Sequence, residues 1–176
     1  MSQGIVPPIK SYACAFCMTG KEEMVARRIE FTFPRIRATP VRQIKRKRLE
    51  GQTVLASQVI FPGYIFLEAE TVGESIAQLP KESFFSLLTK SDVGWKLTGE
   101  DERYAKWVFS IGGLIGMSKA YVEGERVLID SGPLKDLEGQ ILRVDKRNQS
   151  AQVLLTFNNR AVKAWLGYEL IEKRND

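Results

Sequence analysis

The chain has 176 residues, of which 44% are hydrophobic and 27% charged, a composition that is ordinary for one globular domain or two small ones. No apolar run approaches the roughly 18 residues of a membrane span, and the N-terminal residues lack the apolar core of a signal peptide. We therefore expect a cytoplasmic protein with no membrane partner. The chain has no histidine, the commonest general base and metal ligand. The composition thus argues against an enzyme, and we expect no metal and no other cofactor.

The net charge of +5 is distributed unevenly. From Val122 onward nine Lys or Arg residues balance nine Asp or Glu residues, so the whole excess lies before that point. It is concentrated between Arg35 and Leu49, where seven basic residues occur without an acidic one. Such a patch is typical of contact with phosphate backbones or an acidic protein surface, although basic residues on a hairpin edge also deter aggregation between sheets. The candidates for nucleic-acid binding are Arg42, Lys45, Arg46, Lys47 and Arg48.

The first part of the chain predicts a strand, a helix and a charged hairpin. The strand spans Tyr12 to Met18, and a helix from Lys21 to Phe33 follows, with Thr19 as its N-cap and Glu22 completing a capping box. Pro34 ends this helix. The basic stretch then pairs with a returning strand from Thr53 to Val59 around a turn at Gly51-Gln52.

The next elements complete an α+β domain. The continuous apolar run from Tyr64 to Leu67 predicts a central strand covered on both faces. A second helix is expected from Gly73 to Leu79. Phe84 to Leu88 is predicted as a strand or a hydrophobic docking segment, and acidic residues at its start favour a third helix from Glu100 to about Phe109. The order of elements predicts a mostly antiparallel sheet flanked by helices.

The remaining residues predict a small all-β barrel. Glycines interrupt regular structure near residues 111–121, which we interpret as a linker between domains at residues 9–110 and 122–174. Turn signals at Gly-Pro, Arg147-Asn148 and Asn158-Asn159 separate the short strands. The predicted strands include Arg126 to Asp130, Gly139 to Asp145, Ala151 to Phe157 and Arg160 to Ala164. Between Val122 and Val144, two alternating strands flank a loop that begins with Gly132-Pro133 and ends at Gly139, a pattern that favours a β-hairpin.

The only two cysteines are Cys14 and Cys17. A Cys-x-x-Cys pair can be a redox site or half of a zinc site. Here the pair lies in a predicted buried strand, where positions three apart point to opposite faces. Neither histidine nor further cysteine remains to complete a zinc site. We interpret both as small core residues of a protein in a reducing compartment.

Several of these segments resemble the NusG family of bacterial transcription elongation factors. The stretch from Val122 to Val144 resembles the KOW motif, which ribosomal proteins share. The opening strand and turn resemble the family's first strand and helix. The segment Phe61-Pro62-Gly63-Tyr64-Ile65-Phe66-Leu67-Glu68 resembles the strongest signature of its N-terminal (NGN) domain. The resemblance implies an NGN-like α+β domain followed by an SH3-like KOW barrel.

The resemblance also implies partners and sites. The family's N-terminal domain docks on the clamp helices of RNA polymerase through an apolar patch, and Phe16, Phe61 and Tyr64 occupy matching positions, with Phe66 as a neighbour in the strand. Each of these aromatic residues can alternatively belong to the core. The C-terminal barrel recruits ribosomal protein S ten or termination factor Rho, depending on the family member. The matching partner-binding residues are Leu134, Lys135, Arg160 and Val162.

Departures from the family pattern resemble specialised paralogs of the LoaP or RfaH type. In the loop from Phe157 to Ala164, a basic residue stands near the position at which the housekeeping members have an acidic one. The stretch from Val93 to Met117 also differs from the family pattern. Paralogs of this kind act as antiterminators, and in LoaP-like members an RNA hairpin recruits them, which would suit the basic residues between Arg42 and Arg48. We expect a monomeric elongation or antitermination factor that suppresses pausing or termination, with a barrel that stays folded as β-structure.

Two other interpretations remain open at this point. One is a ribosome-associated KOW protein that binds structured RNA and has no affinity for polymerase, with binding that weakens as salt rises. The other is a thiol oxidoreductase that uses Cys14 and Cys17. Unreactive thiols would exclude the second interpretation.

Overall fold

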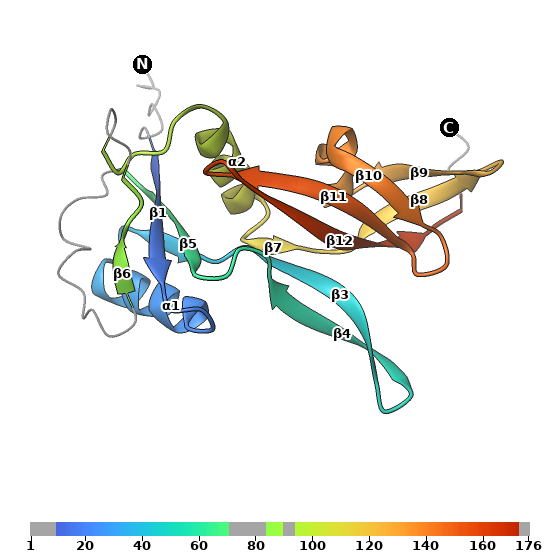
Figure 1. Cartoon of the computed structure of the whole chain (residues 1–176), viewed down its shortest axis with the longest axis horizontal. Helices are drawn as coiled ribbons and strands as arrows, with labels where there is room; N and C mark the ends of the chain where they lie inside the picture. The colour runs from blue at the N-terminus through green and yellow to red at the C-terminus, as the bar shows by residue number, and fades with distance from the viewer. Residues whose placement is uncertain (1–9, 71–83, 90–93, 173–176) are drawn as a thin grey trace, which may run out of the picture. The chain divides into compact units, whose positions relative to one another are not determined.

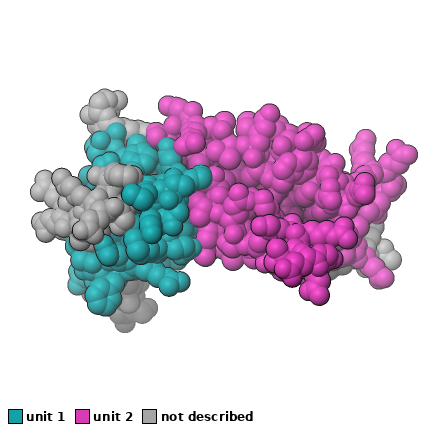
Figure 2. All heavy atoms as spheres, turned by 60° about the horizontal axis from the view of Figure 1, so that its bottom comes forward, with its two compact units in different colours: residues 1–40, 62–112 teal, residues 41–61, 113–176 magenta. Residues whose placement is uncertain are grey.

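The computed structural model describes residues 10–70, 84–89 and 94–172. The chain divides into two compact units, Met1–Pro40 with Pro62–Gly112 and Val41–Phe61 with Gly113–Asp176, which Figure 2 colours separately. This division differs from the expected one, because residues 41–61 group with the C-terminal half of the chain. None of the helices in the described ranges is long and apolar enough to cross a lipid bilayer.

The first unit contains a four-stranded sheet (Figure 1). Its strands are β1 (Ser11–Cys17), β2 (Arg37–Thr39), β5 (Tyr64–Ala69) and β6 (Phe84–Leu87), arranged in the order β2-β5-β1-β6. All neighbouring strands are antiparallel. The two central strands, β1 and β5, are the apolar runs that the sequence predicted as buried strands, and nearly all of their residues are buried.

The two faces of this sheet are covered by different helices. Odd-numbered positions of β1, among them Ala13, Ala15 and Cys17, share a core with α1 (Glu22–Thr32). Even-numbered positions lie on the side of α2 (Gly99–Ser110), where the Tyr12 ring centroid is 6.0 Å from that of Phe109. This alternation is the period of two that a strand imposes on its side chains. Both helices were predicted, and their positions agree with the sequence analysis within two residues.

Helix α1 begins differently from the prediction. Its N-cap is Lys21, without a side-chain capping hydrogen bond, so the expected capping box between Thr19 and Glu22 is not formed. The Glu22 side chain is buried and accepts a hydrogen bond from the backbone N–H of Gly63 at 2.8 Å. A tertiary hydrogen bond therefore takes the carboxylate that local sequence assigned to the cap.

Two further segments of the first unit complete the comparison. Residues 84–87 form β6, so the choice between a strand and a docking segment is decided in favour of a strand. Strand β2 was not predicted separately, because its three residues lay inside the basic stretch. The helix predicted at residues 73–79 lies outside the described residues.

The second unit contains the basic hairpin, formed by β3 (Arg42–Leu49) and β4 (Gln52–Val59). Glu50 and Gly51 occupy its turn with φ of 49° and 82°, the left-handed pair of a tight hairpin. The turn is one residue earlier than predicted. Strand β7 (Leu114–Ile115) pairs in parallel with β3, so the stretch expected to be a linker contributes to a three-stranded sheet, and β8 begins at Ser118.

A five-stranded sheet forms the rest of this unit, in the order β10-β11-β12-β8-β9. The strands are β8 (Ser118–Glu123), β9 (Arg126–Ser131), β10 (Ile141–Asp145), β11 (Ser150–Phe157) and β12 (Arg160–Leu170). Strand β12 pairs with β11 over residues 160–167 and with β8 over residues 168–170. Asn158 and Asn159, at φ of 49° and 58°, make the predicted turn between β11 and β12. The unit is therefore built mainly from strands, in agreement with the expectation of a β domain, whereas the expected KOW barrel stays a prediction.

The hairpin predicted between Val122 and Val144 is not formed by direct pairing. A short helix α3 (Pro133–Asp136) and a 3-10 turn η2 (Glu138–Gln140) separate β9 from β10, and these two strands stand at opposite ends of the sheet order. The glycine that was expected at the turn is nevertheless required. Gly132 has φ of 92°, and a Cβ there would lie 2.9 Å from the Ser118 Cα.

Candidate functional site

Two aromatic residues of the proposed docking surface meet on the first unit. Phe16 of β1 pairs directly with Tyr64 of β5 across the sheet. Their ring centroids are 4.9 Å apart at 75°, an edge-to-face contact. Both side chains are half-buried. The pair is thus held rigidly by the sheet while part of its apolar surface stays available to a partner.

A glycine turn positions this pair. Gly63 immediately precedes Tyr64, has φ of 82°, and its backbone oxygen accepts a hydrogen bond from the Cys17 N–H at 2.9 Å. A Cβ at this position would approach the Cys17 carbonyl oxygen to 3.1 Å. Since the Gly63 N–H is bound by the buried Glu22 carboxylate, both polar groups of the turn are fixed by residues of the first unit.

The other two aromatic candidates lie in cores. Phe66 is fully buried, and its ring centroid lies 5.7 Å from that of Tyr104 on α2. Phe61 is 1% exposed and belongs to the second unit, where its ring is 6.2 Å from Phe157. The structure therefore brings together Phe16 and Tyr64 but not all four residues, and the core alternative describes Phe61 and Phe66.

The five basic candidates lie on one strand, β3. Arg42, at its start, is half-buried and donates its backbone N–H to the Gly113 carbonyl. Lys45 is also half-buried, whereas Arg46, Lys47 and Arg48 are exposed near the turn. The high content of long cationic side chains is compatible with a strand because hairpin pairing with β4 satisfies the backbone while the charges remain in water.

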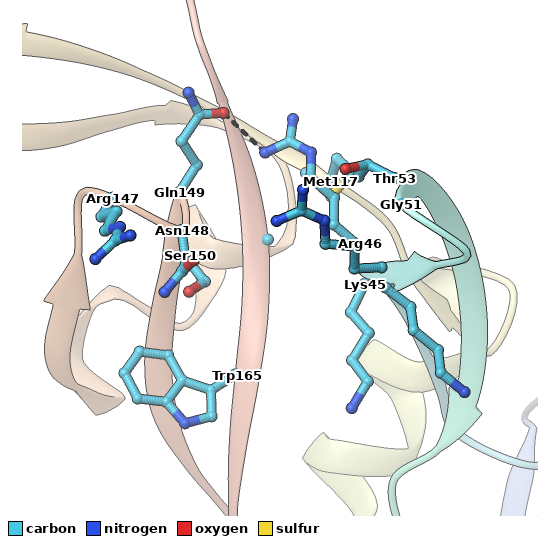
Figure 3. A pocket seen from close by; sticks show the side chains of 13 residues that line it. Lys45, Arg46, Gly51, Thr53, Met117, Arg147, Asn148, Gln149, Ser150 and Trp165 are labelled. Atoms are coloured by element: carbon cyan, nitrogen blue, oxygen red, sulfur yellow. Dashed lines mark hydrogen bonds between the residues drawn. The ribbon is translucent and has the colours of Figure 1, made fainter.

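Four of these cations line a groove of about 700 Å³ within the second unit (Figure 3). One side is formed by Lys45, Arg46, Lys47 and Arg48, together with Gly51 and Thr53 of the hairpin. The other side is formed by residues of the β10–β11 turn and of β11 and β12, and Met117 also contributes. The residues from these elements are Arg147, Asn148, Gln149, Ser150, Trp165 and Gly167.

The groove is strongly positive. Five of its lining residues are Lys or Arg and none is Asp or Glu. Among the residues that the structure describes, Lys45, Lys47 and Arg48 form no salt bridge. Arg46 instead donates to the Gln149 side-chain oxygen at 2.8 Å, a contact that joins the hairpin to the β10–β11 turn of the same unit. Unneutralised cations around a concave surface attract phosphate groups.

The predicted partner-binding residues of the C-terminal half differ in how far their side chains are exposed. Leu134 is completely buried, and its backbone N–H donates to the Ser118 side chain at 2.9 Å, so it is a core residue of α3 and not an exposed anchor. Lys135 is exposed and pairs with Glu138 at 3.1 Å. Arg160 is exposed and Val162 is half-buried, both on β12.

The cysteines occupy the positions expected of core residues. Cys14 is fully buried on the α2 side of β1, and Cys17 is buried on the α1 side. Burial raises the pKa of Cys14 well above its usual range and raises that of Cys17 to about 11. Because the thiolate is the nucleophile, both thiols are poorly suited to redox chemistry.

Sequence reasoning missed the residues on the second side of the groove. Arg147 and Asn148 were recognised only as a turn signal, and Trp165 was not selected at all. Their grouping depends on the placement of β3 beside strands more than 100 positions later in the chain. A tryptophan in a strand otherwise rich in small and polar residues was the one available signal.

The fold defines a class of protein that combines an α+β unit with a β unit, and comparison with known proteins agrees with this class. The solved structure of Thermotoga maritima NusG, described as showing domain interaction, has a similar fold, with a TM-score of 0.50, 19% identity, and coverage of 90% of this chain and 94% of that one.

The sequence itself is similar to the transcription termination/antitermination protein NusG of Borreliella burgdorferi. The two are 26% identical over 144 residues, which cover 76% of this chain and 78% of the relative. No family model matches the chain. The sequence similarity supports a relation to the NusG transcription factors, which are non-enzymatic, and so agrees with the expectation that the chain is not an enzyme.

Proposed function

We propose that this protein is a transcription elongation or antitermination factor that docks on the clamp helices of bacterial RNA polymerase. The proposal rests on the similarity to Borreliella NusG across about three quarters of both chains. Docking would suppress pausing or termination if the protein binds the elongating state of the polymerase more tightly than the paused state, because only differential affinity shifts such an equilibrium.

The docking surface in this proposal is centred on Phe16 and Tyr64. Half-buried aromatic side chains bury a large apolar area when a partner covers them, and such residues dominate the energetics of protein interfaces. Their edge-to-face contact and the fixed Gly63 turn limit the conformational entropy that would be lost on binding. Phe66 would support this surface from the core of the same unit, whereas Phe61 belongs to the core of the second unit.

The second unit would recruit the protein to its site of action through contacts with nucleic acid and with a partner protein. Its basic groove supports contact with nucleic acid, and a protein partner such as ribosomal protein S ten or Rho would contact the exposed residues Lys135 and Arg160. Recruitment through a nucleic-acid element is what distinguishes a specialised paralog, of the LoaP or RfaH type, from a housekeeping factor. We include this specialisation in the proposal because the cations of β3 are gathered on one side of a groove.

The test is binding of the full chain to the isolated clamp helices of bacterial RNA polymerase. We expect Tyr64→Ala to weaken binding by about tenfold or more, as for an interface hot spot. The matched control is Phe31→Ala, because Phe31 is an aromatic residue of the same unit that is 90% exposed and lies on α1. If the unmodified protein does not bind the clamp helices, the function becomes that of a KOW-type RNA-binding protein without polymerase affinity.

A further inference from the structure

The basic groove combines two kinds of lining that serve different parts of a nucleotide. Its cations can neutralise phosphate charge, whereas the indole of Trp165 offers a flat aromatic surface at the same site. Its volume of about 700 Å³ falls within the range of small-molecule sites, roughly 300–1,000 Å³. A surface that met only the outside of a duplex would need the cations and not the indole.

Trp165 is held in position from outside the groove. The guanidinium carbon of Arg143 lies 4.8 Å from the centroid of the indole ring, within the range of a cation–π contact. Arg143 comes from β10 and does not line the groove, whereas the half-buried Trp165 does. The backbone of Trp165 is also fixed, because Trp165 pairs with Gln152 of β11 in the sheet. The ring is thus ordered before any ligand arrives, which reduces the entropic cost of stacking on it.

Two small residues, Ser150 and Gly167, line the groove beside Trp165. Gly167 of β12 is two residues along from Trp165, and Ser150 of β11 pairs with this glycine across the sheet. A Cβ at Gly167 would come within 2.5 Å of the Met117 sulfur, so a side chain there would displace Met117. The glycine therefore makes room for Met117, which itself lines the groove.

We infer that the groove binds an unpaired nucleotide of a nucleic-acid strand, with phosphates against Lys45, Lys47 and Arg147 and the base stacked on Trp165. The inference deepens the nucleic-acid contact of the proposed function and rests on it. In a duplex the faces of the bases are covered by their neighbours, whereas a single strand or a loop exposes them, and every base has an aromatic face to stack. The groove would accordingly select single-stranded segments over paired ones.

The experiment measures fluorescence anisotropy of labelled oligonucleotides with the full chain, at several salt concentrations between about 0.05 and 0.2 M, and compares the probes at the same concentration. The probes are an oligouridine of about 12 nucleotides, the same strand with abasic riboses at its central positions, oligothymidine of the same length, and a blunt RNA duplex. The abasic strand keeps every phosphate and lacks the central bases, so it isolates the contribution of stacking. Oligothymidine distinguishes DNA from RNA as the source of the strand.

We expect the abasic strand to bind about 5- to 150-fold more weakly than oligouridine, the effect of losing one stacked base. Trp165→Leu should abolish this difference, and Trp165→Phe should retain part of it. Lys47→Ala should weaken the binding of all probes alike and reduce the slope of the logarithm of affinity against the logarithm of salt concentration by about 1. Lys119 is an exposed lysine of β8, and Lys119→Ala should change neither the affinity nor the slope. Far-UV circular dichroism and a melting curve establish that the Trp165 variants are folded.

Equal binding of oligouridine and the abasic strand would overturn the inference, as would absence of binding to every probe. A duplex that binds as tightly as the single strand, with Trp165→Leu unaffected, would also overturn it. None of these measurements includes polymerase. Failure of the docking proposal would appear separately, in the clamp-helix experiment with Tyr64→Ala.

Discussion

The hydrogen bond from the Gly63 N–H to the Glu22 carboxylate makes a quantitative prediction about the docking turn. Replacing Glu22 by alanine leaves a buried donor without an acceptor, which costs about 1–3 kcal/mol. It also removes a negative charge from the first turn of α1, worth about 0.3–1 kcal/mol at a helix N-terminus. We expect Glu22→Ala to lower the free energy of unfolding by about 2–3 kcal/mol.

Two matched variants separate these contributions. Glu22→Gln keeps an acceptor oxygen at the same place and loses only the charge, so we expect a loss of about 1 kcal/mol. Glu100→Ala removes an exposed carboxylate from the first turn of α2, where no buried donor depends on it, and should cost less than about 1 kcal/mol.

The assay is urea unfolding followed by far-UV circular dichroism, together with hydrogen exchange at the Gly63 amide measured by NMR. Glu22→Ala should accelerate exchange at Gly63, while Glu22→Gln should leave the amide largely protected. If alanine and glutamine destabilise equally, or if exchange at Gly63 is unchanged in Glu22→Ala, the turn does not depend on this carboxylate. The positioning of Tyr64 would then need another explanation.

Three further predictions concern other parts of the chain. Lys10, Tyr12 and Arg37 donate to Glu68 and, despite its burial, hold its pKa below the usual value. The folded pKa is thus below the unfolded one, so the stabilisation is present above about pH 4.3 and is lost as pH falls through the folded pKa. Urea unfolding between pH 7 and pH 3 should show a steeper loss of unfolding free energy than in Glu68→Gln, and parallel curves for the two proteins would contradict this. A thiol reagent at pH 8 should react slowly with Cys14 and Cys17 until urea unfolds the chain, because burial raises both pKa values; fast reaction of the native protein would restore the redox interpretation. Gly132→Ala should lower the unfolding free energy by about 1–3 kcal/mol because its φ is positive and its Cβ site is occupied, whereas Gly139→Ala, with open space around it, should change it little, and similar effects at the two sites would refute the argument.

Local patterns in the sequence predicted most of the first unit. The apolar runs of β1 and β5 and the helix at Gly99–Ser110 follow from burial on both faces and from acidic residues at a helix start. The turn at Asn158-Asn159 follows from the tolerance of asparagine for positive φ. These features depend on residues close together in the chain, which is why a single sequence reveals them.

Features that depend on distant residues could not be predicted in the same way. Glu22 had a local role as a capping residue available, and only the fold shows that Gly63 takes its carboxylate instead. The loop after Gly132 satisfied a hairpin pattern, yet it forms α3, because Leu134 is buried and its N–H is bound by Ser118. Similarly, one side of the basic groove comes from the β3–β4 hairpin and the other mainly from the β10–β11 turn, β11 and β12, so the sequence around Trp165 does not show that it lies beside the basic strand.

The assignment of the β3–β4 hairpin to the second unit means that the chain passes between the units three times, after Pro40, Phe61 and Gly112. Neither unit is therefore a continuous piece of sequence, and no single cut can release one intact. A fragment ending at Gly112 would hold the hairpin without β7, its parallel partner strand. A gene fusion or a truncation designed at that point would divide the second unit, whereas a circular permutant opened between Glu50 and Gly51 would keep both strands of the hairpin and all three crossings.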